Sequence, residues 1–295
     1  METLHTPYDG SAMPFGIGLA RLDPATWIDI DHHFEQYIQE KHRLTRERFD
    51  DVFVAEPGTE AAQREVAELI SAHVCDHCTP DNVAGESAAL AGPDDEALPV
   101  LHQAAFQVQE DLVLMRKGDA GWRLAAASVC FPSSWRLSEK FGRVMEDIHG
   151  PVPGFSSGTR NAALITRIFD NLQIDMPVLR WNWSIYGDAR LFHPQSNDSS
   201  EGKFGPGPIA RNIYLRLERQ TLRKLPESGD ILFTIRIYND PLERLETHPD
   251  GARLASAIAD QVKSLSPAER AYKGLATEQH RLLDRLATIE RNQTG

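Results

Sequence analysis

The order of periodic segments along this 295-residue chain predicts an α+β fold built on an antiparallel sheet. Helical periodicity comes first, an alternation typical of strands fills most of residues 105–238, and helical periodicity returns near residue 251. A meander of about five strands between two sets of helices is the α+β pattern. The length allows one large domain or two modest ones. We expect an N-terminal arm over residues 1–30 and a single domain over residues 31–295.

Each segment has a local reason. Residues 1–30 are rich in Pro and Gly with few periodic apolar positions, so we expect an arm that lies on the surface. Residues 79–99 lack a period and read as a loop. The predicted helices cover residues 34–48, 59–78, 162–172, 251–264 and 276–291. The first predicted strands are a pair at 105–115 and 122–131 around a turn at 117–121, followed by a tight hairpin of 180–186 with 189–192. A polar loop or lid is predicted at 193–211, and two further strands are predicted at 212–218 and 230–238.

The stretch 125–153 organises the centre of the chain. An apolar run ends at Phe131 and Pro132, and Ser133 or Ser134 can cap the helix that follows. The apolar positions of that helix recur at helical spacing: Leu137, Phe141, Val144 or Met145, and Ile148. Gly150 then ends the helix directly after His149.

His149 therefore lies at a helix terminus beside a buried face. This is suitable geometry for an axial metal ligand. A histidine at a helix C-terminus is also a common capping or core residue, because its cation suits the helix dipole there. The residues alone leave both interpretations open.

Three predicted strands carry polar residues on alternate positions. These are Arg180, Asn182 and Ser184; Tyr214, Arg216 and Glu218; and Thr234, Arg236 and Tyr238, which share their alternate positions with the apolar Leu232. If the strands are neighbours, these residues share one face of the sheet. That face is either solvated or the floor of a pocket in which arginines meet carboxylates.

The HVCDHC segment contains His73, Cys75, His77 and Cys78, and is the most metal-like cluster by composition. Zinc sites usually need four ligands from two such pairs, and the only other cysteine is Cys130. A single C-x-x-C without a βαβ setting is also a weak redox signal. We expect no metal here.

Composition excludes several classes of function. The net charge is −12 and no basic stripe is present, which argues against nucleic acid or an anionic membrane as partner. Three cysteines, no signal-peptide pattern and no apolar run of membrane-spanning length predict a cytoplasmic protein. Nucleotide-binding loops and flavin, nicotinamide and iron–sulfur motifs are not found.

Three blocks of sequence resemble one known family in the same order. FPSSWRLSEKFGRVMEDIHGPVP (131–153), RWNWSI (180–185) and LRLERQTLRKLPESGDILFTIRIYNDPL (215–242) are similar to the signatures of the haem-dependent oxidative N-demethylase alpha-subunit family. Together they cover about the middle half of the chain. The family's haem domain is PAS-like, so the resemblance implies a PAS-like antiparallel sheet with flanking N- and C-terminal helices.

The resemblance implies a haem b monooxygenase that uses O2 to oxidise the carbon next to the nitrogen of an amine, which releases formaldehyde. His149 is the implied iron ligand. The other implied residues are Arg219 and Asn182 for cofactor binding, and Arg216, Glu218 and Arg236 for catalysis. Because the chain shows no flavin or iron–sulfur motif, a separate flavin or iron–sulfur reductase subunit is expected.

Two other functions stay open. A PAS-type haem protein can be a gas or redox sensor, although a sensor normally feeds an output domain and none is visible. The chain can also be a non-catalytic ligand-binding protein that has lost haem.

Overall fold

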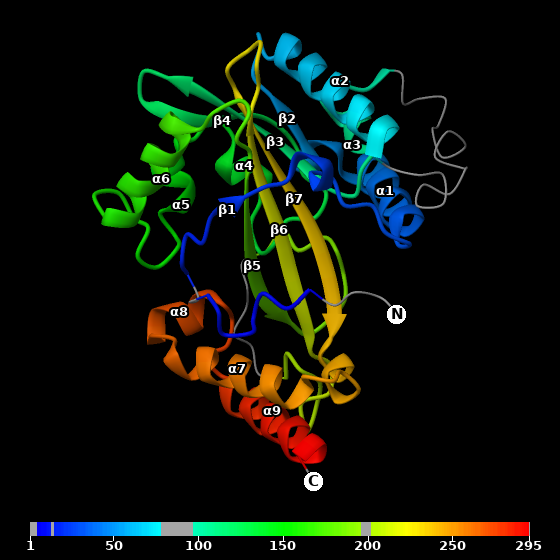
Figure 1. Cartoon of the computed structure of the whole chain (residues 1–295), viewed down its shortest axis with the longest axis vertical. Helices are drawn as coiled ribbons and strands as arrows, with labels where there is room; N and C mark the ends of the chain where they lie inside the picture. The colour runs from blue at the N-terminus through cyan, green and yellow to red at the C-terminus, as the bar shows by residue number, and fades with distance from the viewer. Residues whose placement is uncertain (1–4, 13–14, 78–96, 196–201, 295) are drawn as a thin grey trace.

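An antiparallel sheet runs through the middle of the molecule (Figure 1). The structure is a computed structural model, which describes residues 5–12, 15–77, 97–195 and 202–294. Within these residues the sheet has seven strands in the order β1-β5-β6-β7-β3-β4-β2. The strands are β1 (Ala20–Arg21), β2 (Phe53–Ala55), β3 (Asp111–Gly118), β4 (Gly121–Ser128), β5 (Val178–Tyr186), β6 (Tyr214–Lys224) and β7 (Ile231–Pro241). The predicted α+β class and antiparallel sheet are confirmed, while the PAS-like assignment stays a prediction.

Three groups of helices pack around this sheet (Figure 1). The first group is α1 (Phe34–Val52), α2 (Glu60–His77) and α3 (Val100–Ala105); the second is α4 (Leu137–Lys140), α5 (Met145–His149) and α6 (Arg160–Asn171); the third is α7 (Gly251–Ser264), α8 (Pro267–Tyr272) and α9 (Gln279–Thr294). Short 3-10 helices lie at Pro24–Thr26 and Leu242–Glu246. None of the described helices combines the length and apolar character needed to cross a bilayer.

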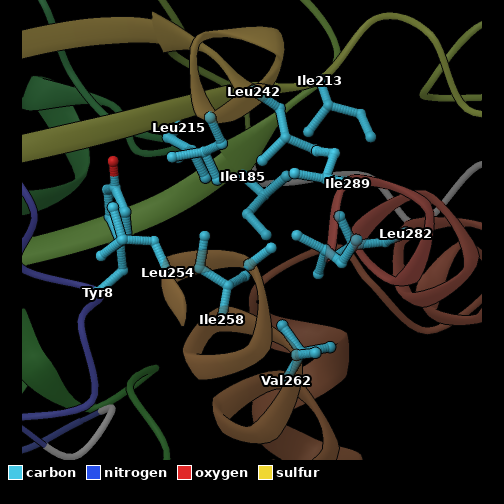
Figure 2. Packing of buried hydrophobic residues seen from close by; sticks show 14 of the residues in the cluster. Tyr8, Ile185, Ile213, Leu215, Leu242, Leu254, Ile258, Val262, Leu282 and Ile289 are labelled. Atoms are coloured by element: carbon cyan, nitrogen blue, oxygen red, sulfur yellow. The ribbon is translucent and has the colours of Figure 1, made fainter. Parts of the chain in front are cut away.

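Separate apolar cores attach these groups to the two faces of the sheet. Helices α2 and α3 pack on Leu112, Leu114 and Leu232, and α4–α6 pack on the opposite face through residues such as Val113 and Met115. Helices α7 and α9 form a third core with β5 and β6, and Figure 2 shows Leu254, Ile258 and Ile289 pointing toward Ile185 and Leu215. Alternate residues of one strand thus belong to different cores.

Most of the predicted elements are present. Helices α1, α2, α6, α7 and α9 match their predicted ranges within a few residues. Gly118 pairs with Gly121, which confirms the β-hairpin turn at 117–121. The first predicted strand, 105–115, begins later than expected, because α3 ends at Ala105 and residues 106–110 form turns and bends before β3. Cys78 and most of the predicted loop at 79–99 lie outside the described residues.

The single helix predicted after Ser134 is wrong. Two short helices, α4 and α5, replace it, since Gly142 adopts φ +71° and its N–H bonds to the carbonyl of Leu124 in β4. Ser134 does not cap a helix either. Its Oγ lies 2.6 Å from the hydroxyl of Tyr186, and Arg136 occupies the N-cap position of α4.

The predicted hairpin between residues 180–186 and 189–192 is also wrong. All nine residues of β5 pair with β6, which offers a longer ladder, and residues 189–192 form no strand. The N-terminal arm differs from expectation too. Tyr8, Leu22 and Trp27 are almost fully buried, so much of the arm is part of the cores instead of lying on the surface.

Buried charge ties α1 to the segment before β3. The side chain of Lys41 is fully buried, and its ammonium donates to the carbonyls of Ala105, Val108 and Glu110 at 2.8, 2.9 and 2.5 Å. The carboxylate of Asp111, buried nearby, accepts the N–H groups of Cys130 and Phe131 at 2.8 and 2.9 Å. These hydrogen bonds join α1, the segment before β3 and the segment after β4.

We predict that Lys41→Met destabilises the protein by about 3–5 kcal/mol, because three buried carbonyls lose their donor and Asp111 loses a nearby cation. Urea unfolding followed by circular dichroism measures this change. The matched control is Arg43→Met on the same helix, whose exposed pairs with Glu40 and Glu47 should contribute less than about 1 kcal/mol. Equal losses for the two variants would contradict the assignment.

A second prediction concerns pH. Burial lowers the pKa of His102 to about 3, with Lys41 adding to the shift, and its two ring nitrogens lie 2.9 Å from the hydroxyls of Ser128 and Thr45. The folded protein keeps this ring neutral, whereas the unfolded chain binds a proton near pH 6.5. The contribution to stability is therefore present above about pH 6.5 and is lost as pH falls towards 3.

His102→Gln should accordingly show a weaker loss of unfolding free energy than the wild type between pH 6.5 and 4.5, measured by urea unfolding. The difference should be at most about 1.4 kcal/mol per pH unit. His280→Gln, at an exposed position of α9, is the control variant. Parallel profiles for His102→Gln and the wild type would refute this account.

Candidate functional site

A cavity of about 990 Å³ lies between one face of the sheet and the helices α4–α6. Its walls are largely apolar, with side chains from β3, β4 and β7 on one side and from α5, α6 and the loop between them on the other. The apolar lining includes Val113, Met115, Leu124, Phe233, Ile235, Ile148, Val152, Phe155, Ile165, Ile168 and Phe169. Helix α8 and the arm residues Phe15, Ile17 and Leu19 complete it.

One part of the wall is polar because of how β5 pairs with β6. Asn182 lies opposite Glu218, and Arg180 lies opposite Gln220, so these four side chains share the cavity face. Oε2 of Glu218 accepts hydrogen bonds from Nδ2 of Asn182 at 3.1 Å and from Nε2 of Gln220 at 2.5 Å. Two amides therefore hold the carboxylate in place at the cavity wall.

His149 lines the cavity at the end of α5, as its place in the sequence predicted. Its Nδ1 lies 3.0 Å from the carbonyl oxygen of Met145. Because a carbonyl can only accept, Nδ1 carries the hydrogen and Nε2 keeps its lone pair in the neutral ring. Burial lowers the pKa of His149, and the nearby cations of Lys140 and Arg180 act in the same direction. The neutral imidazole is the form that binds metals.

A lysine from the C-terminal region reaches the same cavity. Lys273 follows α8, is nearly buried, and donates to the carbonyl of Trp183 in β5 at 2.7 Å. Burial lowers its pKa to about 8, while the carboxylate of Glu218 opposes that shift. Its ammonium also lies 5.1 Å from the ring centroid of Phe15 in the arm. The N-terminal arm and the segment after α8 thus meet at this wall.

A hydroxyl pair stands beside the carboxylate. The Tyr186 hydroxyl and Ser134 Oγ are 2.6 Å apart, and both residues line the cavity. Burial raises the pKa of Tyr186, so its phenol stays protonated at neutral pH. The pair offers a hydrogen-bond donor to a ligand in the cavity.

Among the residues predicted for the site, His149, Asn182 and Glu218 line the cavity, and three arginines do not. Arg216 shares the face of Glu218, but its guanidinium donates to Ser133 Oγ at 2.9 Å and to the carbonyls of Phe131 and Leu191 at 2.8 and 3.0 Å. It joins β6 to the segment after β4. These hydrogen bonds support the cavity wall, and Arg216 itself does not line the cavity.

Arg219 and Arg236 lie on the opposite face of the sheet, at positions directly opposite each other in the β6–β7 ladder. Arg219 donates to the carbonyls of Thr26 and Trp27. Arg236 is fully buried, forms an ion pair with Asp31 at 2.8 Å, and stacks on two tyrosines. The prediction that the polar residues of all three strands share one face is wrong, because Glu218 pairs with Ile237 and not with Arg236.

The HVCDHC segment holds no metal-like group among its described residues. The His73 ring is packed against Trp27, and its Nε2 accepts the N–H of Ile28 at 3.4 Å. Cys75 is an exposed free thiol, and Cys78 lies outside the described residues. No cluster of three or more metal-ligating side chains occurs in the described ranges.

Sequence reasoning placed Arg180 on a strand face that could form a pocket floor but did not choose it as a site residue, and it missed Lys273, Tyr186 and Gln220. The alternation of β5 contained a signal for Arg180 and Tyr186. No local pattern marks Lys273, since its role comes from the packing of α8 on β5.

Comparison with known families identifies the family of this chain. A family model described as haem-dependent oxidative N-demethylase, alpha subunit-like, matches residues 18–283. The matched residues include His149, the cluster of Asn182, Glu218 and Gln220, and the rest of the cavity lining except Phe15 and Ile17. The chain therefore belongs to the haem-dependent oxidative N-demethylase, alpha subunit-like family.

Proposed function

We propose that this protein binds haem b in the cavity, with His149 as the iron ligand, and catalyses the oxidative N-dealkylation of an amine with O2. Membership of the family supports a haem-dependent oxidative enzyme. The observation that carries the assignment of the site is His149: a neutral imidazole that lines a large apolar cavity, with Nδ1–H held by the Met145 carbonyl. A histidine ligand usually has its second nitrogen held in this way.

The residues present fit a haem. The cavity volume is at the upper end of the range of about 300–1,000 Å³ that ligand pockets span, as a large macrocycle requires. Its aliphatic and aromatic walls suit an apolar ring system. Lys140, Arg143, Arg180 and Lys273 also line it and can meet propionate groups. Bound haem supplies the oxidising chemistry, and the protein supplies the ligand, the orientation and the proton positions.

The polar wall suits an amine. The carboxylate of Glu218, held by Asn182 and Gln220, can bind an ammonium group or take a proton from the amine nitrogen. The Tyr186 hydroxyl, paired with Ser134, is a protonated donor on the same wall. We assign Arg216, Arg219 and Arg236 to support of the wall and the arm, because their hydrogen bonds go to backbone carbonyls and buried partners.

The first test is the visible absorption spectrum. The protein, expressed with haem supplementation, should be red-brown, with a Soret band that shifts on reduction and on addition of carbon monoxide. His149→Ala should stay folded by circular dichroism, because Leu137 and Phe155 still pack α4–α6 against the sheet. It should lose most of its haem or show an altered spin state.

His193→Ala is the matched control. His193 is a largely buried histidine that packs on Tyr186 without lining the cavity. Its ferric spectrum should equal that of the wild type. Full haem content and an unchanged Soret band in His149→Ala would remove the proposed ligand, and a colourless wild-type protein would remove the proposed function.

A further prediction concerns the electron source. The family description as an alpha subunit supports a partner subunit, and we propose that this partner is a flavin or iron–sulfur reductase. The isolated chain should not consume O2 with NADPH and an N-methylamine, and turnover measured as formaldehyde should need an added reductase or peroxide. Robust NADPH-dependent turnover by the chain alone would contradict this dependence.

A further inference from the structure

We propose that Arg180, with Lys273 beside it, forms a carboxylate-binding site at the polar end of the cavity. The inference rests on the proposed function for the identity of the cavity and adds the chemistry of its ligand. The carboxylate can come from a haem propionate or from the substrate. In the second case the substrate is an N-alkyl amino acid in place of a simple amine.

The motivating observation is an unsatisfied guanidinium. Nε of Arg180 is buried and has no hydrogen-bond partner among the described residues. Nη2 of its guanidinium donates a hydrogen bond to the carbonyl of Gly16 at 3.2 Å. Arg180 is half-buried, and a partly desolvated cation with an orphan donor is stabilised when an anion pairs with it. Arg216, in contrast, is surrounded by several acceptors. Nη2 of Arg236 also lacks a hydrogen bond, but it forms an ion pair with Asp31 at 2.8 Å and does not line the cavity.

Neighbouring groups do not meet this need. Glu218 is near enough to stabilise the Arg180 cation, but no ion pair joins the two in the described part of the chain. The carboxylate of Glu218 instead accepts the amides of Asn182 and Gln220. The Arg180 side chain lines the cavity, so an anion there can pair with its guanidinium, while Nε itself is covered by protein atoms.

The charge balance of the wall selects the kind of anion. Arg180 and Lys273 are two cations and Glu218 is one anion, and each lies within electrostatic range of the others. The net charge of these three groups is one positive charge, which matches a monoanion such as a carboxylate. Glu218 would repel a phosphate dianion. Guanidinium groups bind carboxylates through two parallel N–H donors. An N-alkyl amino acid can place its carboxylate at Arg180 and its ammonium at Glu218.

The experiment uses the haem-loaded protein and two probes, N-methylglycine and N-methylethylamine, which differ in one carboxylate. Binding is measured by Soret difference spectra and by the shift in melting temperature, and haem release is measured by transfer to apomyoglobin. The variants are Arg180→Gln and the charge-conserving Arg180→Lys. The control is Arg223→Gln on β6, whose guanidinium stacks 4.6 Å from the Trp27 ring away from the cavity.

A substrate carboxylate is indicated if Arg180→Gln weakens N-methylglycine binding at least tenfold, changes N-methylethylamine binding less than twofold, and leaves haem release unaltered. A propionate is indicated if haem release accelerates at least tenfold and neither probe is affected selectively. Either result supports the site, with Arg180→Lys intermediate and Arg223→Gln like the wild type. Probe binding and haem release within twofold of wild type in Arg180→Gln would overturn the proposal.

The two proposals fail separately. If the protein carries no haem, the shift in melting temperature with N-methylglycine and with acetate still tests the carboxylate site on the purified chain. Loss of that shift in Arg180→Gln would support the site, and no shift in the wild type would overturn it.

Discussion

The register of β6 between β5 and β7 is the constraint on which the rest of this structure depends. Pairing of Glu218 with Asn182 on one side and with Ile237 on the other decides which side chains face the cavity. A slip of one residue would turn Glu218 and Gln220 to the opposite face and bring Leu217 and Arg219 into the cavity. The apolar residues of β6 specify this register, because Leu215 and Leu217 must meet the core formed with α7 and α9 (Figure 2).

Buried cations then attach irregular segments to this sheet. Arg216 holds the segment after β4, Arg219 holds the arm at Thr26 and Trp27, and Lys41 holds the carbonyls before β3. Each cation satisfies backbone acceptors that no helix or ladder satisfies. Such groups carry a large desolvation cost, so they stabilise the fold only while all of their partners are in place. Arg180 is the member of this set that lines the cavity with an orphan donor, which is why it suggests a ligand.

The cavity is assembled from parts that are far apart along the chain. The arm supplies Phe15, α5 supplies His149, the middle strands supply Asn182 and Glu218, and the segment after α8 supplies Lys273. The packing of the segment after α8 on β5 brings the Lys273 cation to the wall that carries the carboxylate of Glu218. Apolar walls with a few placed polar groups are the usual arrangement for orienting a small ligand.

The sequence by itself determined the α+β class, the helices around the sheet, the alternation of each strand and the position of His149 at a helix end, because these are local properties of periodicity and punctuation. The three ordered blocks also led to the family. Only the tertiary structure decided that Arg236 and Arg219 face away from Glu218, that residues 189–192 do not pair with β5, and that Lys273 reaches the cavity. The physical reason is that alternation defines two faces of a strand without saying which face meets which neighbour. Register and the packing of distant segments make that choice.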